Sequence, residues 1–184
     1  PICIGKNAFS SCEGLTSVTI PSSLKSIAYD AFYCCKNLKT VNITDLKAWC
    51  SIEFSSNPIT LAKSLSLNGE EIRELVIPKG VTVISAHAFE HCDSLTSVMI
   101  PEGVKEIEEQ AFEHCGSLTS VTIPTSVKQI KRLAFGYCSN LQKVNISDLK
   151  SWCDIVFDDD YANPLSFAKH LCLNGEEVHD LVIP

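Results

Sequence analysis

The chain has 184 residues, of which 15 are Lys or Arg and 22 are Asp or Glu, so its net charge is −7. This acidic balance argues against nucleic-acid binding, because contact with phosphates requires a basic face. Apolar residues make up 45% and charged residues only 20%, which excludes a disordered chain, and no apolar run approaches the roughly 20 residues that span a bilayer.

The first part of the chain, residues 1–42, consists of repeated units of 23 residues. An Ala-Phe pair recurs at Ala8-Phe9 and Ala31-Phe32, and the spacing places this pair on a short helical or 3₁₀ turn. Each unit ends with Leu-x-x-Val-x-Ile, whose apolar and polar residues alternate as in a half-buried strand.

Residues 43–76 form a longer unit. It contains Asp-Leu-Lys-x-Trp-Cys-x-Ile-x-Phe, then Asn57-Pro58, and then Asn68-Gly69 after a short alternating apolar run. An Asn-Gly pair in this position indicates a tight hairpin turn. We therefore expect an enlarged coil with a small helix after Asn57-Pro58 and a hairpin that returns to the sheet.

The second part repeats the first. Residues 77–145 are again ordinary units, and residues 146–184 form a second long unit. There we likewise expect a small helix after Asn163-Pro164 and a hairpin at Asn174-Gly175. Phe32 and Phe135 lie 103 residues apart, so the chain contains two copies of a larger block.

Units of this length cannot bury their apolar side alone, but stacked units share a continuous core. The sequence therefore predicts one solenoid over residues 1–184. We expect a right-handed β-rich coil of the leucine-rich-repeat type, with one parallel sheet on the concave face and short helical or 3₁₀ turns on the convex side. Because no polar cap is visible at either end, we also expect a fragment of a longer chain.

The repeated pattern I-P-x-x-V-K-x-I-x-x-x-A-F-x-x-C-x-x-L-x-x-V-x-I resembles the BspA-type leucine-rich repeat over essentially the whole chain. The Trp-Cys and Leu-Asn-Gly segments of the long units resemble parts of the same group. The resemblance implies a cell-surface or secreted protein of bacterial or protozoan type. It also implies adhesion to a protein partner such as a host extracellular-matrix or cell-surface protein.

The cysteines follow the repeat. One repeat position holds Cys12, Cys35, Cys92, Cys115 and Cys138, and the two long units share Cys50 and Cys153. Cysteine is often fully buried and packs as a small apolar group, so we predict a ladder of core thiols. Disulfides between neighbouring coils remain an alternative, because a spacing of about 5 Å lies within their Cα range. Cys3, Cys34 and Cys172 lie outside the ladder and are predicted to be exposed.

Catalytic and metal-binding patterns are weak. His91-Cys92 and His114-Cys115 recur in adjacent units, but neighbouring residues point in different directions, so histidine should face solvent where cysteine faces the core. No phosphate-binding glycine loop, nucleophile elbow or zinc-protease motif is present. The run Asp158–Asp160 indicates a solvated loop tip. We predict no enzyme, no cofactor and no metal.

The outward positions of the predicted strands form the candidate binding surface. They are mostly small and polar and include no aromatic platform for a sugar, which favours a protein partner. Two alternatives stay open: these hydroxyls can simply be good strand formers, and the repeats can be a stalk that spaces another domain. The candidate residues are Ser17, Thr19, Thr40, Asn42, Glu74, Ser97, Met99, Ser120, Thr122, Lys143 and Asn145, with Val76, Asp180 and Val182 at equivalent positions.

Overall fold

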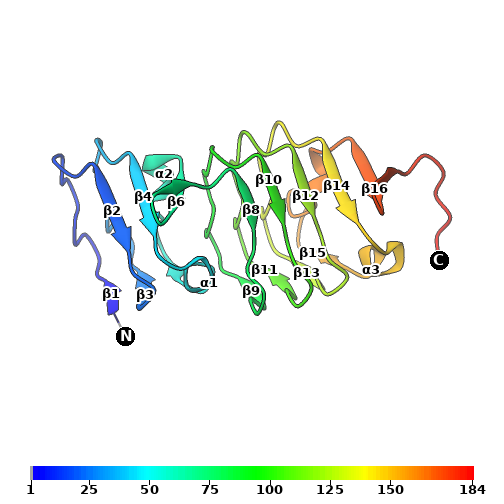
Figure 1. The fold of residues 1–184 in the computed structure, drawn as a ribbon, viewed down its shortest axis with the longest axis horizontal. Coiled ribbons are helices and arrows are strands. Elements are labelled where there is room, and N and C mark those ends of the chain that lie inside the picture. Colours follow the sequence, from blue (N-terminus) through cyan, green and yellow to red (C-terminus); the bar gives the residue numbers. More distant parts are fainter. Residues whose placement is uncertain (1) are drawn as a thin grey trace.

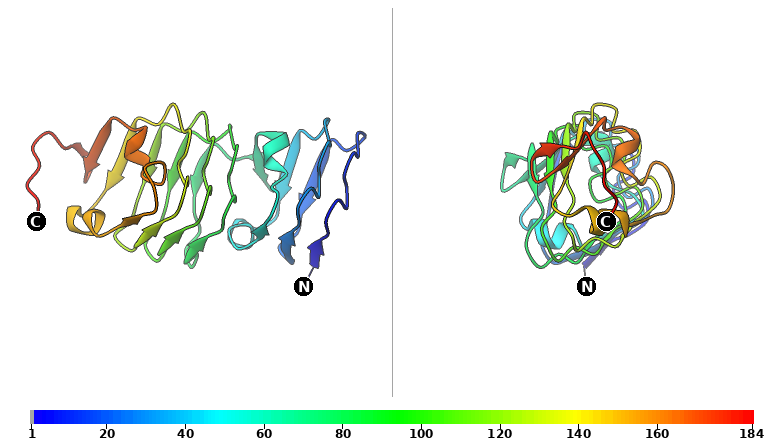
Figure 2. Two further views of the ribbon diagram at one scale, coloured as in Figure 1. Left: turned by 180° about the vertical axis from the view of Figure 1, so that it is seen from behind. Right: turned by 90° about the vertical axis from the view of Figure 1, so that its right-hand side faces the viewer.

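The computed structural model describes residues 2–184 as an elongated stack of coils (Figures 1 and 2). The two ends of the chain lie at opposite ends of the stack, and successive coils follow one another along it. The predicted repeat solenoid is confirmed. Within the described residues, no helix is long and apolar enough to cross a bilayer.

The Leu-x-x-Val-x-Ile segments form the predicted parallel strands on one side of the coils, which we call the front face. Val98 and Val121 point inward at 2% and 0% exposure. Neighbouring strands pair in the register of the repeat, with Val98 beside Val121 and Ser97 beside Ser120. The front strands are β2 (Ser17–Ile20), β4 (Thr40–Ile43), β6 (Leu65–Leu67), β8 (Glu74–Val76), β10 (Ser97–Met99), β12 (Ser120–Thr122), β14 (Lys143–Ile146) and β16 (His170–Leu173).

The return segments of the coils also pair as short parallel strands, on what we call the return face. The sequence analysis did not assign strands here. One inward isoleucine holds three of the four segments in the second block, as Ile107 and Ile130 do at 0% exposure, and Phe157 takes this place in the last segment. The return strands are β1 (Ile2–Ile4), β3 (Leu24–Ile27), β5 (Glu53–Phe54), β9 (Val83–Ile84), β11 (Glu106–Ile107), β13 (Gln129–Ile130) and β15 (Val156–Phe157).

Both long units end in the hairpins that the Asn-Gly pairs predict. β6 pairs antiparallel with β7 (Glu70–Glu71), and β16 with β17 (Glu176–Glu177). Asn68 and Gly69 both have positive φ, 50° and 90°, as a tight two-residue turn of this type requires.

The first hairpin divides the sheets. β7 occupies the edge of β6 where the next parallel strand would pair, so the front face consists of β2-β4-β6-β7 and β8-β10-β12-β14-β16-β17. The return face divides likewise into β1-β3-β5 and β9-β11-β13-β15. The core nevertheless continues across this junction, because one cluster of buried residues extends from Ile20 to Ala168. The predicted single sheet is thus present as two segments over one core.

Short helices occur in the long units. The helix expected after Asn57-Pro58 is α2 (Ile59–Ala62), and the one after Asn163-Pro164 is the 3₁₀ turn η1 (Pro164–Ser166). Two further helices, α1 (Leu46–Trp49) and α3 (Leu149–Cys153), were not predicted. Asp45 and Asp148 cap them by accepting hydrogen bonds from the amides of Ala48 and Ser151.

The Ala-Phe pairs lie in successive turns closed by i→i+3 hydrogen bonds of the 3₁₀ type, such as that from the Ala88 amide to the Ser85 carbonyl at 3.2 Å. The expected short turn is therefore present, without a continuous helix. Left-handed residues recur at equivalent places in these turns, among them His91 and His114, both with φ of 58°. The turns also bond across coils, since the Phe89 amide donates to the Ala111 carbonyl at 2.8 Å. In the core beside them, the rings of Phe89 and Phe112 stack with centroids 5.2 Å apart.

The segment after β17 departs from the predicted strand. Asp180 and Val182 were expected on the outward side of a front strand, but residues 181–184 have no regular structure. Leu181, Val182 and Ile183 are 56%, 83% and 64% exposed. The corresponding strand in the first block, β8, is held by pairing with β10 of the coil that follows it. No strand within residues 2–184 pairs with residues 181–183.

Candidate functional site

All eleven candidate residues lie on front strands, on β2 and β4 of the first front sheet and on β8, β10, β12 and β14 of the second. Parallel pairing arranges the residues of the second front sheet in straight rows across the strands. One row contains Glu74, Ser97, Ser120 and Lys143, and the other contains Val76, Met99, Thr122 and Asn145. The hairpin strand β7 separates the candidate residues of β2 and β4 from these rows, so the candidate surface consists of two patches.

The register also adds residues that the sequence analysis missed. His170 continues the row of Lys143, Cys172 continues the row of Asn145, and Ser66 lies beside Asn42. These positions belong to long units, where the repeat spacing changes. The alternating runs before the two Asn-Gly pairs would have identified them as front strands.

An apolar pair marks the start of the second patch. Val76 and Met99 lie side by side on β8 and β10 and are 57% and 53% exposed. Thr122 continues this row, and Ser97 and Ser120 are half-buried in the row beside it. The result is an exposed apolar pair bordered by small polar groups.

The charged groups at the margins of this patch are partly neutralised. Arg73 pairs with Glu71 at 2.5 Å, and the Nδ1 atom of His170 forms a hydrogen bond with the Glu177 carboxylate across the second hairpin. This hydrogen bond to His170 holds the pKa of the Glu177 carboxyl below its ordinary value.

Several polar side chains of the front face have structural hydrogen bonds. The hydroxyl of Thr96 donates to the Arg73 carbonyl at 3.1 Å, and Thr119 repeats this bond to Thr96 at 3.0 Å. The side-chain carbonyl of Asn42 accepts from the Gly69 amide at 2.8 Å, which ties the hairpin to β4. Asn42 is therefore part of the scaffold as well as of the candidate surface.

The comparisons with known proteins agree with this architecture. A model of the BspA type leucine rich repeat region matches residues 2–68 and 60–170, in six copies. The chain belongs to the BspA-type leucine-rich repeat family. A comparison with curated proteins finds none that matches.

Solved structures of leucine-rich repeat proteins resemble this BspA-type chain in fold. The pneumococcal vaccine antigen PcpA is 19% identical, with a TM-score of 0.55, over 88% of this chain and 40% of its own. A leucine rich repeat protein of T. pallidum is 24% identical, with a TM-score of 0.37, over 94% of this chain and 66% of its own. A leucine-rich repeat protein from Bacteroides ovatus is 22% identical, with a TM-score of 0.46, over 84% of this chain and 44% of its own. The chain thus spans less than two thirds of each.

The thiol ladder of this BspA-type chain is buried in its central coils. Cys35, Cys92, Cys115 and Cys138 are all 0% exposed. The Cys115 thiol donates to the Phe89 carbonyl of the preceding coil at 3.2 Å, and Cys138 repeats this bond to Phe112 at 3.2 Å. All ten cysteines are free.

Three cysteine predictions were wrong. Cys12 is exposed because its coil, the first of the stack, is covered on one side only, and Cys153 is exposed although its counterpart Cys50 is buried. Cys172 was expected to be exposed but is only 5% exposed, because it lies on β16 between β14 and the hairpin strand β17. Cys3 is exposed and Cys34 is half-buried.

The burial of these thiols predicts their reactivity. Burial raises the pKa of Cys92 to about 11 and that of Cys138 to about 12, so little thiolate is present to react. We expect a thiol reagent at pH 8 to label Cys3, Cys12 and Cys153 in the native chain. Cys92 and Cys138 should react only after denaturant is added. Mass spectrometry of the labelled peptides measures this, and rapid native labelling of Cys92 would contradict it.

The histidines next to the ladder form an aromatic column along the turns. His91 stacks on His114 with centroids 4.4 Å apart and planes within 3°, and His114 stacks on Tyr137 at 4.6 Å. Because the rings are parallel, the lone pairs of their nitrogens point side by side and do not converge. Burial and the neighbouring Lys63 lower the pKa of His91. Among residues 2–184, no group of three metal-ligating side chains could hold an ion.

Proposed function

We propose that this chain is a non-enzymatic protein-binding module of a cell-surface leucine-rich repeat protein, acting as one solenoid. The observation that carries the proposal is the second front patch, where the exposed Val76–Met99 pair lies among small polar side chains. Protein interfaces commonly have an apolar centre, in which methionine is enriched, and a polar rim. Solenoids bind partners through extended surfaces of this kind. A surface location follows as an expectation from the family.

A second candidate function is that of a rigid spacer. It is favoured by the column of Thr96 and Thr119, whose hydroxyls are used to bond one coil to the next. Such bonds stiffen the stack and leave fewer free groups for a partner. A spacer would have no affinity of its own for a protein partner.

Binding to a panel of immobilised extracellular-matrix proteins separates the two functions. For a binding module we expect saturable binding to at least one of them, weakened at least tenfold by Met99→Arg with Thr122→Arg. The matched control, Ser22→Arg with Ser139→Arg, adds the same charge at exposed turns and should retain binding within about twofold. Binding that survives the first variant would contradict the role of the front patch. Failure of the unmodified chain to bind any of them would favour the spacer.

A further inference from the structure

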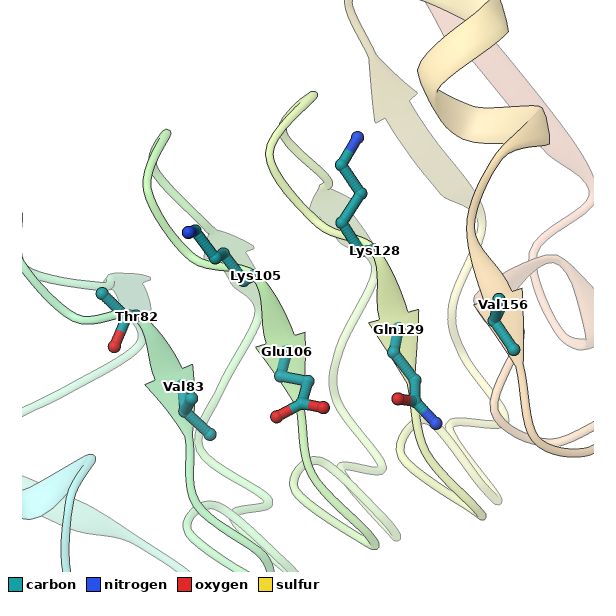
Figure 3. Close-up of a pocket in the computed structure, with 7 residues that line it drawn as sticks. All are labelled: Thr82, Val83, Lys105, Glu106, Lys128, Gln129 and Val156. Carbon is teal, nitrogen blue, oxygen red and sulfur yellow. The ribbon is translucent and has the colours of Figure 1, made fainter.

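The return face carries a groove of about 690 Å³ over four neighbouring coils (Figure 3). Its floor is one straight row across β9, β11, β13 and β15, which are paired in register. The side chains of this row are Val83, Glu106, Gln129 and Val156. Thr82, Lys105 and Lys128 line one side of the row, at the beginnings of the strands. A groove of this volume is in the range that holds small ligands or a few residues of a peptide.

The acidic and amide groups of the groove already have partners. The Glu106 carboxylate lies 3.9 Å from the Lys131 ammonium, and the Gln129 amide donates to Asp158 at 2.9 Å. The neighbouring Glu108 is paired with Lys131 at 2.7 Å. A single ammonium, that of Lys131, thus serves both Glu106 and Glu108, and Asp158 receives a hydrogen bond but no counter-charge from Gln129.

The two lysines of the groove are not neutralised. Within residues 2–184, no carboxylate lies within 4.0 Å of the ammonium of Lys105 or Lys128, and Lys128 bonds only to the Thr125 carbonyl at 3.4 Å. They lie at equivalent positions of adjacent coils, and both side chains extend away from the floor, Lys105 toward the coil of Thr82 and Lys128 in a different direction. In a chain with a net charge of −7, this pair attracts carboxylates to one place.

The two ends of the floor are apolar. Val83 is 36% and Val156 58% exposed, and they are three strand spacings apart, about 14 Å. An extended peptide advances about 3.4 Å per residue and presents every second side chain to the same side. Residues i and i+4 of such a peptide are therefore about 14 Å apart and face the same way, and residue i+2 lies between them.

We propose that this groove binds an extended acidic segment of a partner protein, running along the stack across the return strands. Apolar side chains at the first and fifth positions cover Val83 and Val156. A carboxylate at the third position pairs with Lys105 and Lys128. This surface is distinct from the front patch, so it is a second binding site whose occupant is defined by charge and by spacing.

The peptide Ser-Leu-Glu-Glu-Glu-Leu-Ser tests this, titrated into the full ¹⁵N-labelled chain. We expect saturable shift changes at the amides of β9, β11, β13 and β15. Lys105→Glu with Lys128→Glu should weaken binding at least tenfold, whereas Met99→Arg should leave it unchanged. The spectra of the variants report directly whether they fold. Shift changes centred on the front strands, or no saturable change, would overturn the proposal.

A matched control separates site recognition from general attraction of charge. Lys36→Glu with Lys39→Glu changes the net charge by the same amount at exposed positions of the first block, and binding should stay within about threefold. A peptide with lysine in place of its three glutamates should not bind saturably. If the control variant loses as much affinity as the groove variant, the groove is not the site.

Discussion

Phe112→Ala is expected to lower the free energy of unfolding by about 3–5 kcal/mol, the usual cost of cutting a fully buried phenylalanine back to alanine. Phe112 is 0% exposed, and its ring lies between those of Phe89 and Phe135, with centroids 5.2 and 5.3 Å away. The turns on both sides cannot close over the cavity. Their amides are bonded across coils, as in the 2.8 Å bond from Phe112 to the Ala134 carbonyl. Urea unfolding followed by circular dichroism measures the loss.

The first coil provides the matched control. Phe9 occupies the same repeat position, but it is 41% exposed and stacks on one side only, on Phe32 at 5.4 Å. Phe9→Ala should therefore cost roughly 1 kcal/mol, because much of the ring is already in water. If both variants lost the same free energy of unfolding, the stabilisation from each phenylalanine would not depend on whether its coil is covered on both sides.

The path of the coil could be predicted from the sequence because units of constant length place equivalent residues beside each other in neighbouring coils. Once Val98 and Val121 are assigned to equivalent strands, their pairing follows, and so do the outward rows of the front face. The return strands were missed for a physical reason. β11 and β13 are two residues long, and two residues cannot show the alternation by which a strand is recognised.

Burial at the ends and junctions of the stack could not be predicted from the repeat. Cys12 and Cys35 hold the same repeat position, yet only Cys35 has a coil on both sides and is buried. Cys172 points to the outer side of its strand and is covered by a hairpin. The return-face groove likewise depends on which charges are paired between coils, as Lys131 is with Glu108 and Lys105 is not. A sequence pattern describes a position, whereas exposure depends on what the neighbouring coil places beside it.

Asn57 connects the first long unit to the coil that follows it. It is 3% exposed, and its side-chain amide donates to the carbonyls of His87 at 2.8 Å and Ala88 at 3.1 Å. Its side-chain oxygen accepts from the Ile59 amide at 2.9 Å, at the start of α2. The indole of Trp49 donates to the same Ala88 carbonyl at 2.9 Å. These bonds hold the two blocks together where neither sheet is continuous.

Asn57→Ala is therefore expected to cost roughly 2–6 kcal/mol, because it leaves the Ile59 amide and the His87 carbonyl without their partner, at about 1–3 kcal/mol for each such buried group. The equivalent residue Asn163 is half-buried and caps η1 through one bond to the Leu165 amide at 2.9 Å. Asn163→Ala should cost only about 0.5–2 kcal/mol, as loss of a helix cap does. Denaturant unfolding compares the two, and hydrogen exchange at Ile59 should accelerate in the first variant only. If Asn57→Ala costs no more than Asn163→Ala, the junction between the blocks is held by the buried side chains around Trp49 and not by these hydrogen bonds.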